Sequence, residues 1–297
     1  MNRMLRMIGW GIMLFHGVLA AQNSTGSVPK AYFVSADGIE YREVTARDLE
    51  SAVEISFLGN CGFFISGGGR NILFDAPQRQ SNYPNSATPE DAFQKMIERT
   101  KPFERIDLML FSHDHPDHIT SDMAFRVLMS HQETTMIAND MALSKIRKRN
   151  PAEYEKTKSR IVHAVPAFGE LKTLSAGGLT FEVFGQIHDD RTKEAVTAYL
   201  LELGGLKILL HADTTFDQNL ESLQQLDLEN KGIDLWFFTD RPHATLDKVM
   251  KTMIKPKAYV IMHNPINDAR KYEATVKVYP NAIGFVGSME KKVFIKR

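Results

Sequence analysis

The sequence predicts one layered α/β domain in which helices cover β-sheets. Short apolar runs bounded by turn residues alternate with segments of helical spacing, which is typical of this class. No linker rich in Pro, Gly or Ser divides the chain after residue 50. Of the 297 residues 43% are hydrophobic, which is enough for a full-sized core and excludes a disordered, collagen-like or low-complexity chain.

The first twenty residues have the features of a secretory signal peptide. Arg3 and Arg6 precede an uncharged, mostly apolar run over residues 7–20 that ends in Ala20. This run is shorter than the roughly 20 residues that span a bilayer, so we expect cleavage, with an uncleaved anchor as the alternative. The sequence therefore predicts an exported protein, periplasmic or secreted, with no stable membrane anchor after cleavage.

The charge balance and the cysteine content argue against several other classes of protein. The 36 basic residues equal the 36 acidic ones, so nothing indicates a surface that grips a nucleic-acid backbone. The single cysteine, Cys61, excludes an intrachain disulfide and a cysteine-built zinc finger. In an oxidising compartment we expect this thiol to be buried packing rather than a redox centre.

The elements of the first half follow from apolar runs and glycine turns. Residues 21–50 are polar and mixed, and we expect an N-terminal linker or extension with a hairpin near Asp37-Gly38, before a main domain over residues 51–297. Within the first half of that domain the patterns predict strands at 53–58, 63–66, 72–74, 106–111, 135–138 and 161–165, a loop at 77–89, and helices at 92–99, 121–131 and 141–149.

The second half begins with a hairpin-like pair of strands and then alternates. The pair lies at 179–187 and 197–203, and another strand follows the Gly204-Gly205 turn at 206–210. The remaining patterns predict helices at 218–226, 245–253 and 268–278, strands at 234–238 and 258–262, and closing strands at 283–286 and 292–295.

Residues 113–118 carry the strongest chemical signal. They hold three histidines and two aspartates directly after the buried run at 106–111: His113, Asp114, His115, Asp117 and His118. In extended backbone His113 and His115 point to the same side, and a turn into the next helix can aim Asp117 and His118 nearby. Imidazole nitrogens and carboxylate oxygens are ligands for a borderline divalent metal such as zinc. A solvated polar loop is the alternative, and the spacing at a strand end favours the metal.

The pattern His-x-His-x-Asp-His after an apolar strand resembles the signature of the metallo-β-lactamase-fold superfamily. The likeness extends over roughly residues 51–290 and implies a four-layer αββα sandwich, an α/β (α+β) fold, with a two-metal site along one edge. Segments 57–62 and 72–75 resemble the opening strands of the family. Four further residues match family positions at the carboxyl ends of apolar runs: Asp75, His188, Asp213 and His263.

The resemblance implies a role for each of these residues. It implies two divalent metal ions, favouring Zn²⁺ with Mn²⁺ or Fe²⁺ as alternatives: one held by His113, His115 and His188, and a second by Asp117, His118 and His263, with Asp213 as the bridge. Asp75 is implied to hold a ligand histidine through its other ring nitrogen. Ala212 stands where the family usually has glycine, which makes this turn less similar. His115 stands where the oxygen-reducing di-iron branch has glutamate, which favours hydrolytic zinc.

Four other residues are weaker candidates. His211, two residues before Asp213, is a ligand, a partner of a ligand, or buried and hydrogen-bonded, and we favour the last two interpretations. Arg191, Arg241 and His243 lie on loops that could overhang the site, where they could grip an anionic substrate. Exposed loop charges without a role are the alternative for these three.

These features together predict an exported binuclear metal-dependent hydrolase. A metal-bound hydroxide would attack a small ester, lactone or phosphodiester, with Asp117 orienting the nucleophile and Asp213 bridging the metals. The motifs resemble the branch that contains ascorbate-6-phosphate lactonase and the N-acyl-phosphatidylethanolamine phospholipase D. We expect a small-molecule substrate and no nucleic acid. The alternatives are a non-catalytic exported metal- or ligand-binding protein of the same fold, a nuclease and a mononuclear iron oxygenase.

Overall fold

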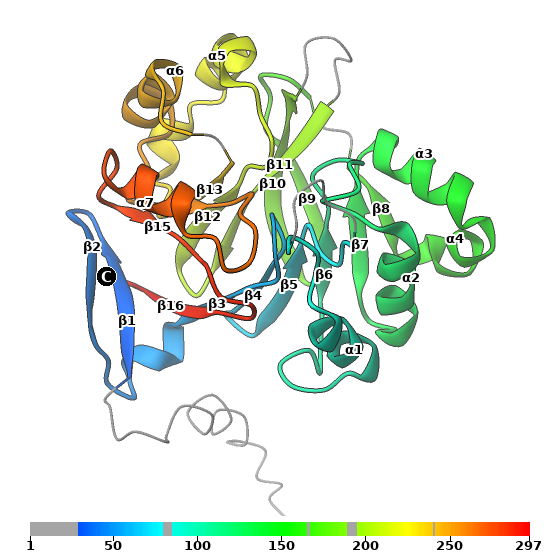
Figure 1. Ribbon diagram of the computed structural model, residues 1–297. Coiled ribbons are helices and arrows are strands. Elements are labelled where there is room, and N and C mark those ends of the chain that lie inside the picture. Colours follow the sequence, from blue (N-terminus) through cyan, green and yellow to red (C-terminus); the bar gives the residue numbers. More distant parts are fainter. Residues whose placement is uncertain (1–28, 80–84, 165–166, 189–194, 240) are drawn as a thin grey trace, which may run out of the picture.

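Two β-sheets packed face to face form the centre of the molecule, and helices cover the outer face of each sheet (Figure 1). The computed structural model describes residues 29–79, 85–164, 167–188, 195–239 and 241–297, and the description below concerns these residues. The predicted signal peptide, residues 1–20, lies outside them. No helix in this part of the chain combines the length and apolarity needed to cross a membrane.

The described strands are divided between a nine-stranded and a seven-stranded sheet. From edge to edge, the first sheet contains β2 (Gly38–Glu43), β1 (Lys30–Ser35), β16 (Lys291–Lys296), β3 (Val53–Phe57), β4 (Phe63–Gly67), β5 (Arg70–Phe74), β6 (Leu108–Leu110), β7 (Thr135–Ala138) and β8 (Ile161–His163). The second contains β15 (Ala282–Ile283), β14 (Ala258–Ile261), β13 (Leu235–Phe238), β12 (Leu206–Leu210), β11 (Ala195–Leu203), β10 (Leu179–Ile187) and β9 (Lys172–Ala176).

The helices form two outer layers. The first sheet is covered by α1 (Glu90–Glu98), α2 (Ser121–Ser130), α3 (Asp140–Arg149) and α4 (Pro151–Thr157). The second is covered by α5 (Phe216–Gln225), α6 (Ala244–Lys248), its π-helical continuation η4 (Val249–Ile254) and α7 (Arg270–Val276). Short 3-10 turns occur at η1 (Asp48–Ser51), η2 (Lys158–Arg160) and η3 (Leu228–Lys231).

Alternation along the strands creates three apolar layers. In β4, Phe63 packs into the core between the sheets, whereas Phe64 packs against the helices beyond the first sheet. Leu73 in β5 likewise faces the helices while its neighbour Phe74 faces the second sheet. Successive side chains of a strand point to opposite faces. The strands of a sheet that is covered on both sides therefore have continuous apolar sequences. With the third layer under α5–α7, this confirms the predicted αββα sandwich.

Strand direction brings several chain segments to one edge of the sandwich. In the first sheet β5, β6, β7 and β8 run parallel, and in the second β12, β13 and β14 do. Strand β10 shares the direction of β12, because both pair antiparallel with β11. The residues that follow β5, β6, β10, β12 and β14 therefore emerge at carboxyl ends, where ligands bind in open α/β sheets.

Most predicted elements are present, with differences where the apolar signal is weak. The hairpin near Asp37-Gly38 is formed by β1 and β2, and the parallel pairing of β1 with β16 extends the first sheet. The sequence analysis missed α4, whose clearest mark is Pro151 at the first helical position, and β9, a half-exposed edge strand. The predicted closing strand at 283–286 is reduced to the two residues of β15.

Candidate metal centre

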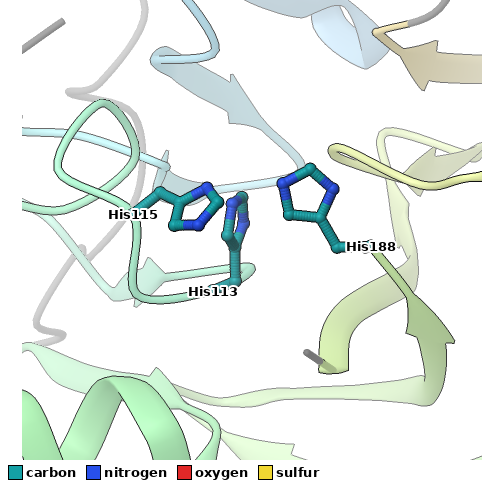
Figure 2. A group of neighbouring side chains, drawn as sticks. All are labelled: His113, His115 and His188. Carbon is teal, nitrogen blue, oxygen red and sulfur yellow. The ribbon is translucent and has the colours of Figure 1, made fainter. Parts of the chain in front are cut away.

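Three of the predicted ligands, His113, His115 and His188, form one group. Their ligating nitrogens lie within 4.8 Å of one another, and Figure 2 shows the three rings converging. His113 and His115 follow β6 of the first sheet, and His188 follows β10 of the second. The group therefore spans the two sheets, and only tertiary packing assembles it.

A second group contains Asp117, His118 and His263, again with ligand atoms within 4.8 Å of one another. Asp213 lies beside it, since its Oδ2 is 3.3 Å from His118 Nε2 and 3.6 Å from His263 Nε2. Asp117 Oδ2 is 3.4 Å from His263 Nε2. The rings of His113 and His118 are 4.0 Å apart between centroids, so the two groups are adjacent. All seven side chains predicted as metal ligands thus gather at one edge.

The loop that carries His113 to His118 is held by polar contacts from its surroundings. The backbone nitrogens of His118 and Ile119 donate to the carbonyl of His115 at 3.0 Å, which closes the turn between the two groups. Asn139, the N-cap of α3, donates from Nδ2 to the Ser112 carbonyl at 3.1 Å. Lys145 forms an ion pair with Asp114 Oδ2 at 3.0 Å. These contacts reduce the freedom of the loop before any ligand is bound.

Asn60 joins two members of the second group. Its Nδ2 donates to the carbonyl of Asp117 at 3.1 Å and to Asp117 Oδ2 at 3.3 Å, and its own carbonyl accepts from His263 N at 3.0 Å. Asn60, Asp75 and His263 have φ values of 51°, 45° and 60°. Asn, Asp and His are the non-glycine residues that most readily take this left-handed conformation, so residue type and backbone agree at these positions.

A buried chain of hydrogen bonds sets the tautomers of His113 and His118. Asp75, fully buried, accepts at 2.8 Å from Ser112 N, Ser112 Oγ and His118 Nδ1. The Ser112 hydroxyl donates its only proton to the Asp75 carboxylate. The hydroxyl oxygen of Ser112 therefore accepts from His113 Nδ1 at 2.9 Å. In its neutral form each of these histidines therefore carries its proton on Nδ1 and keeps a lone pair on Nε2, as the predicted role of Asp75 requires.

The buried atoms that face the site fit a cation. His113 Nε2, His118 Nε2 and Asp213 Oδ1 are buried and have no hydrogen-bond partner, which is costly unless another group binds them. Burial lowers the pKa of His113 well below its usual value. Burial acts likewise on His118, but the carboxylates of Asp213 and Asp75 outweigh it and raise the pKa of His118 well above its usual value. The local field thus favours positive charge at His118 Nε2.

Neighbouring histidines lower the pKa of Asp213. Burial alone would raise its pKa, but His118 and His263 hold the pKa of Asp213 well below its usual range. Ala212, just before it, has no positive φ, so the turn does not need the glycine that the family usually has there. The substitution at residue 212 therefore leaves Asp213 in place beside the second group.

His211 is buried among aromatic side chains. Its ring contacts Phe184, Phe216 and Trp236, and Nδ1 accepts from Trp236 Nε1 at 3.3 Å. Burial lowers its pKa to about 3, so the ring is neutral near pH 7. These contacts are those of a buried, hydrogen-bonded histidine, the interpretation that the sequence favoured together with a contact to a ligand.

A cavity of about 1080 Å³ opens beside the two groups. His188, Asp213 and His263 line it, and so do Arg241 and His243. Two of the three weak substrate-binding candidates therefore face the same space as the predicted ligands. The third, Arg191, lies outside the described residues. Lys271 of α7 also lines the cavity and was not singled out from the sequence.

Apart from Asp75, sequence reasoning missed the residues that hold the ligands. Ser112 and Asn60 are buried next to predicted ligands, and their positions inside the motifs at 112–118 and 57–62 were the available signal. Asn139 and Lys145 are distant in sequence and carried no signal. Cys61 is fully buried, as expected, but its Sγ also lies within 4.8 Å of ligand atoms of His118 and Asp213.

Residues 70–265, more than half of the chain, match the family model described as the β-lactamase superfamily domain. The chain belongs to the metallo-β-lactamase-fold superfamily. The resemblance noted in the sequence is thus confirmed at the level of the superfamily. No curated protein matches the sequence of this superfamily member.

Solved structures share the fold of this superfamily member at low sequence identity. Igni18, a metallo hydrolase from the hyperthermophilic archaeon Ignicoccus hospitalis, is 18% identical, with a TM-score of 0.57 over 82% of this chain and 98% of that one. An isothiocyanate hydrolase from Delia radicum gut bacteria is 13% identical, with a TM-score of 0.52 over 82% and 99%. CmlA, a diiron β-hydroxylase from Streptomyces venezuelae, is 16% identical, with a TM-score of 0.53 over 86% and 55%.

Proposed function

We propose that this protein is an exported hydrolase that depends on two divalent metal ions. His113, His115 and His188 would hold one ion, Asp117, His118 and His263 the other, and Asp213 would bridge them. The observation that carries the proposal is the convergence of two ligand groups whose members come from both sheets. The partnerless buried atoms His113 Nε2 and His118 Nε2 support it independently.

The donor set favours zinc, with manganese or iron(II) as alternatives. Five of the six residues in the two groups are histidines, and Asp117 and Asp213 add carboxylates. This mixture of nitrogen and oxygen ligands suits a borderline ion better than a hard one such as Ca²⁺. When bound, such ions supply Lewis acidity and acidify water, which gives a nucleophile near neutral pH.

The surrounding residues supply binding and orientation. We assign Asp117 to orienting the attacking water, because Asn60 holds its carboxylate in place beside His263. The cavity would seat a small ester, lactone or phosphodiester, since its volume is that of a small-molecule site. Arg241 and His243 would hold a negatively charged part of this substrate. The basic, largely apolar leader over residues 1–20 supports export to the periplasm or the medium.

Elemental analysis of the mature chain, residues 21–297, tests the metal content. We expect close to two zinc or manganese ions per chain and their loss in a His115→Ala/His118→Ala variant. Absence of bound metal after reconstitution with zinc, manganese and iron would refute the proposal. One bound iron with oxygen uptake would instead identify an oxygenase.

Panels of esters, lactones and phosphodiesters then test hydrolysis by the metal-loaded protein. Turnover that is lost in His115→Ala supports the hydrolase. Two bound metal ions without turnover on any panel would favour the non-catalytic binding protein. Cleavage of generic RNA or DNA at moderate salt would favour the nuclease.

A further inference from the structure

The loop between β3 and β4 places a thiol beside the second ligand group. Cys61, the only cysteine in the chain, is fully buried. Its Sγ, a ring nitrogen of His118 and a carboxylate oxygen of Asp213 lie within 4.8 Å of one another. The preceding residue, Asn60, contacts Asp117 and His263, so this loop reaches every member of the second group.

The two residues beside Cys61 each have a buried atom without a hydrogen-bond partner. His118 is fully buried, its Nδ1 is hydrogen-bonded to Asp75, and its Nε2 has no hydrogen-bond partner. Asp213 Oδ1 is also buried without a partner. A nitrogen lone pair, a carboxylate oxygen and a thiol that face one another have the ligand types of a zinc site. Packing in the apolar core explains the burial of Cys61, but not why its Sγ lies close to two side chains whose buried atoms need a cation.

We propose that Cys61 is a sulfur ligand of the second metal ion, together with His118 and Asp213. This inference rests on the proposed function, because it assumes that the second group binds a metal. On coordination the thiol loses its proton to solvent, the sulfur lone pair forms the bond to the metal, and no oxidation state changes. Because thiolate is a soft ligand, the second position should prefer zinc over manganese.

X-ray absorption at the zinc edge of the zinc-loaded mature chain tests the proposal. We expect a sulfur shell at about 2.3 Å in addition to nitrogen and oxygen ligands at about 2.0–2.2 Å. The shell should be lost in Cys61→Ser, which separates the thiolate from the methionine thioethers. It should persist in His115→Ala, which removes a ligand of the other group only.

The outcomes separate this inference from the proposed function. Bound zinc with nitrogen and oxygen ligands alone would overturn the role of Cys61 and leave the hydrolase intact, whereas absence of bound zinc would overturn both. The spectrum of the unaltered protein decides the matter even if Cys61→Ser does not fold. A competition titration gives a second readout: Cys61→Ser should lower the preference for zinc over manganese by about tenfold or more, and an unchanged preference contradicts the proposal.

Discussion

Asp75→Asn changes one buried atom from an acceptor to a donor. Asp75 accepts from Ser112 N at one oxygen, and from Ser112 Oγ and His118 Nδ1 at the other. An asparagine of the same shape has a single acceptor oxygen, so its amide nitrogen must face at least one of these donors. If it faces His118, Nδ1 must become the acceptor, and the ring proton moves to Nε2. The lone pair that faces the second group is then lost.

The expected effect on metal binding follows from that lost lone pair. Removing an outer partner of a ligand histidine typically weakens metal affinity by about 10- to 100-fold, which equals about 1.4–2.7 kcal/mol. A buried donor left without an acceptor costs about 1–3 kcal/mol of folding stability. We therefore expect Asp75→Asn to reduce both zinc affinity and the free energy of unfolding, and to affect the second ion more than the first.

Asp107 offers a matched control. It is a buried carboxylate just before β6, so the length of that strand separates it from the ligand loop, and it accepts from Asn71 N at 2.9 Å and pairs with Arg70. Asp107→Asn should lower stability but leave zinc affinity unchanged. Titration with a competing chelator and thermal unfolding measure the two quantities. A folded Asp75→Asn protein that binds zinc as tightly as the unaltered chain would refute the tautomer argument.

Three further predictions concern the metal, the cavity and the core. Chelation of zinc should lower the melting temperature in a concentration-dependent way, because a ligand at 100 times its Kd stabilises by about 2.7 kcal/mol; an identical transition with and without chelator contradicts this. Arg241→Ala should raise KM for an anionic substrate and change kcat little, whereas equal effects on a neutral substrate would exclude charge recognition. Phe63→Ala removes a ring that contacts Phe237 and Phe285 across the sheets, and denaturant titration should show a loss of about 3–5 kcal/mol; a loss below about 1 kcal/mol contradicts its role in joining the sheets.

Local sequence patterns were sufficient to predict the fold class, because this sandwich is built from short, strongly apolar strands. The runs around Phe63 and Leu110 are buried on both faces, so their hydrophobicity is high enough to be recognised without alignment. Where burial is partial, as in β9, the pattern is too weak to predict a strand. The helix α4 shows the same limit, since only Thr157 of its residues is buried and its start is marked by Pro151 alone.

Ligand identity was readable from the sequence because metal binding demands particular residue types at short spacing, as in His113 to His118. Which ligands lie together followed from the resemblance to the family and not from residue types alone, because it depends on strand direction and on contacts between distant segments. His188 meets His113 only because β10 and β6 end at the same edge of two different sheets. The supports Asn60, Asn139 and Lys145 are placed by backbone geometry and loop packing.

The sequence by itself thus determined the fold class, the superfamily and the chemical type of the ligands, because each depends on residue type and local periodicity. The resemblance to the family implied how those ligands divide into two groups, whereas the tertiary structure decided how the segments that carry them meet and which hydrogen bonds leave the Nε2 lone pairs of His113 and His118 facing the site. The tertiary structure also decided that Cys61, a member of the apolar core between the sheets, lies beside His118 and Asp213. These features arise from the packing of two sheets against each other, and no segment of the chain contains that information alone.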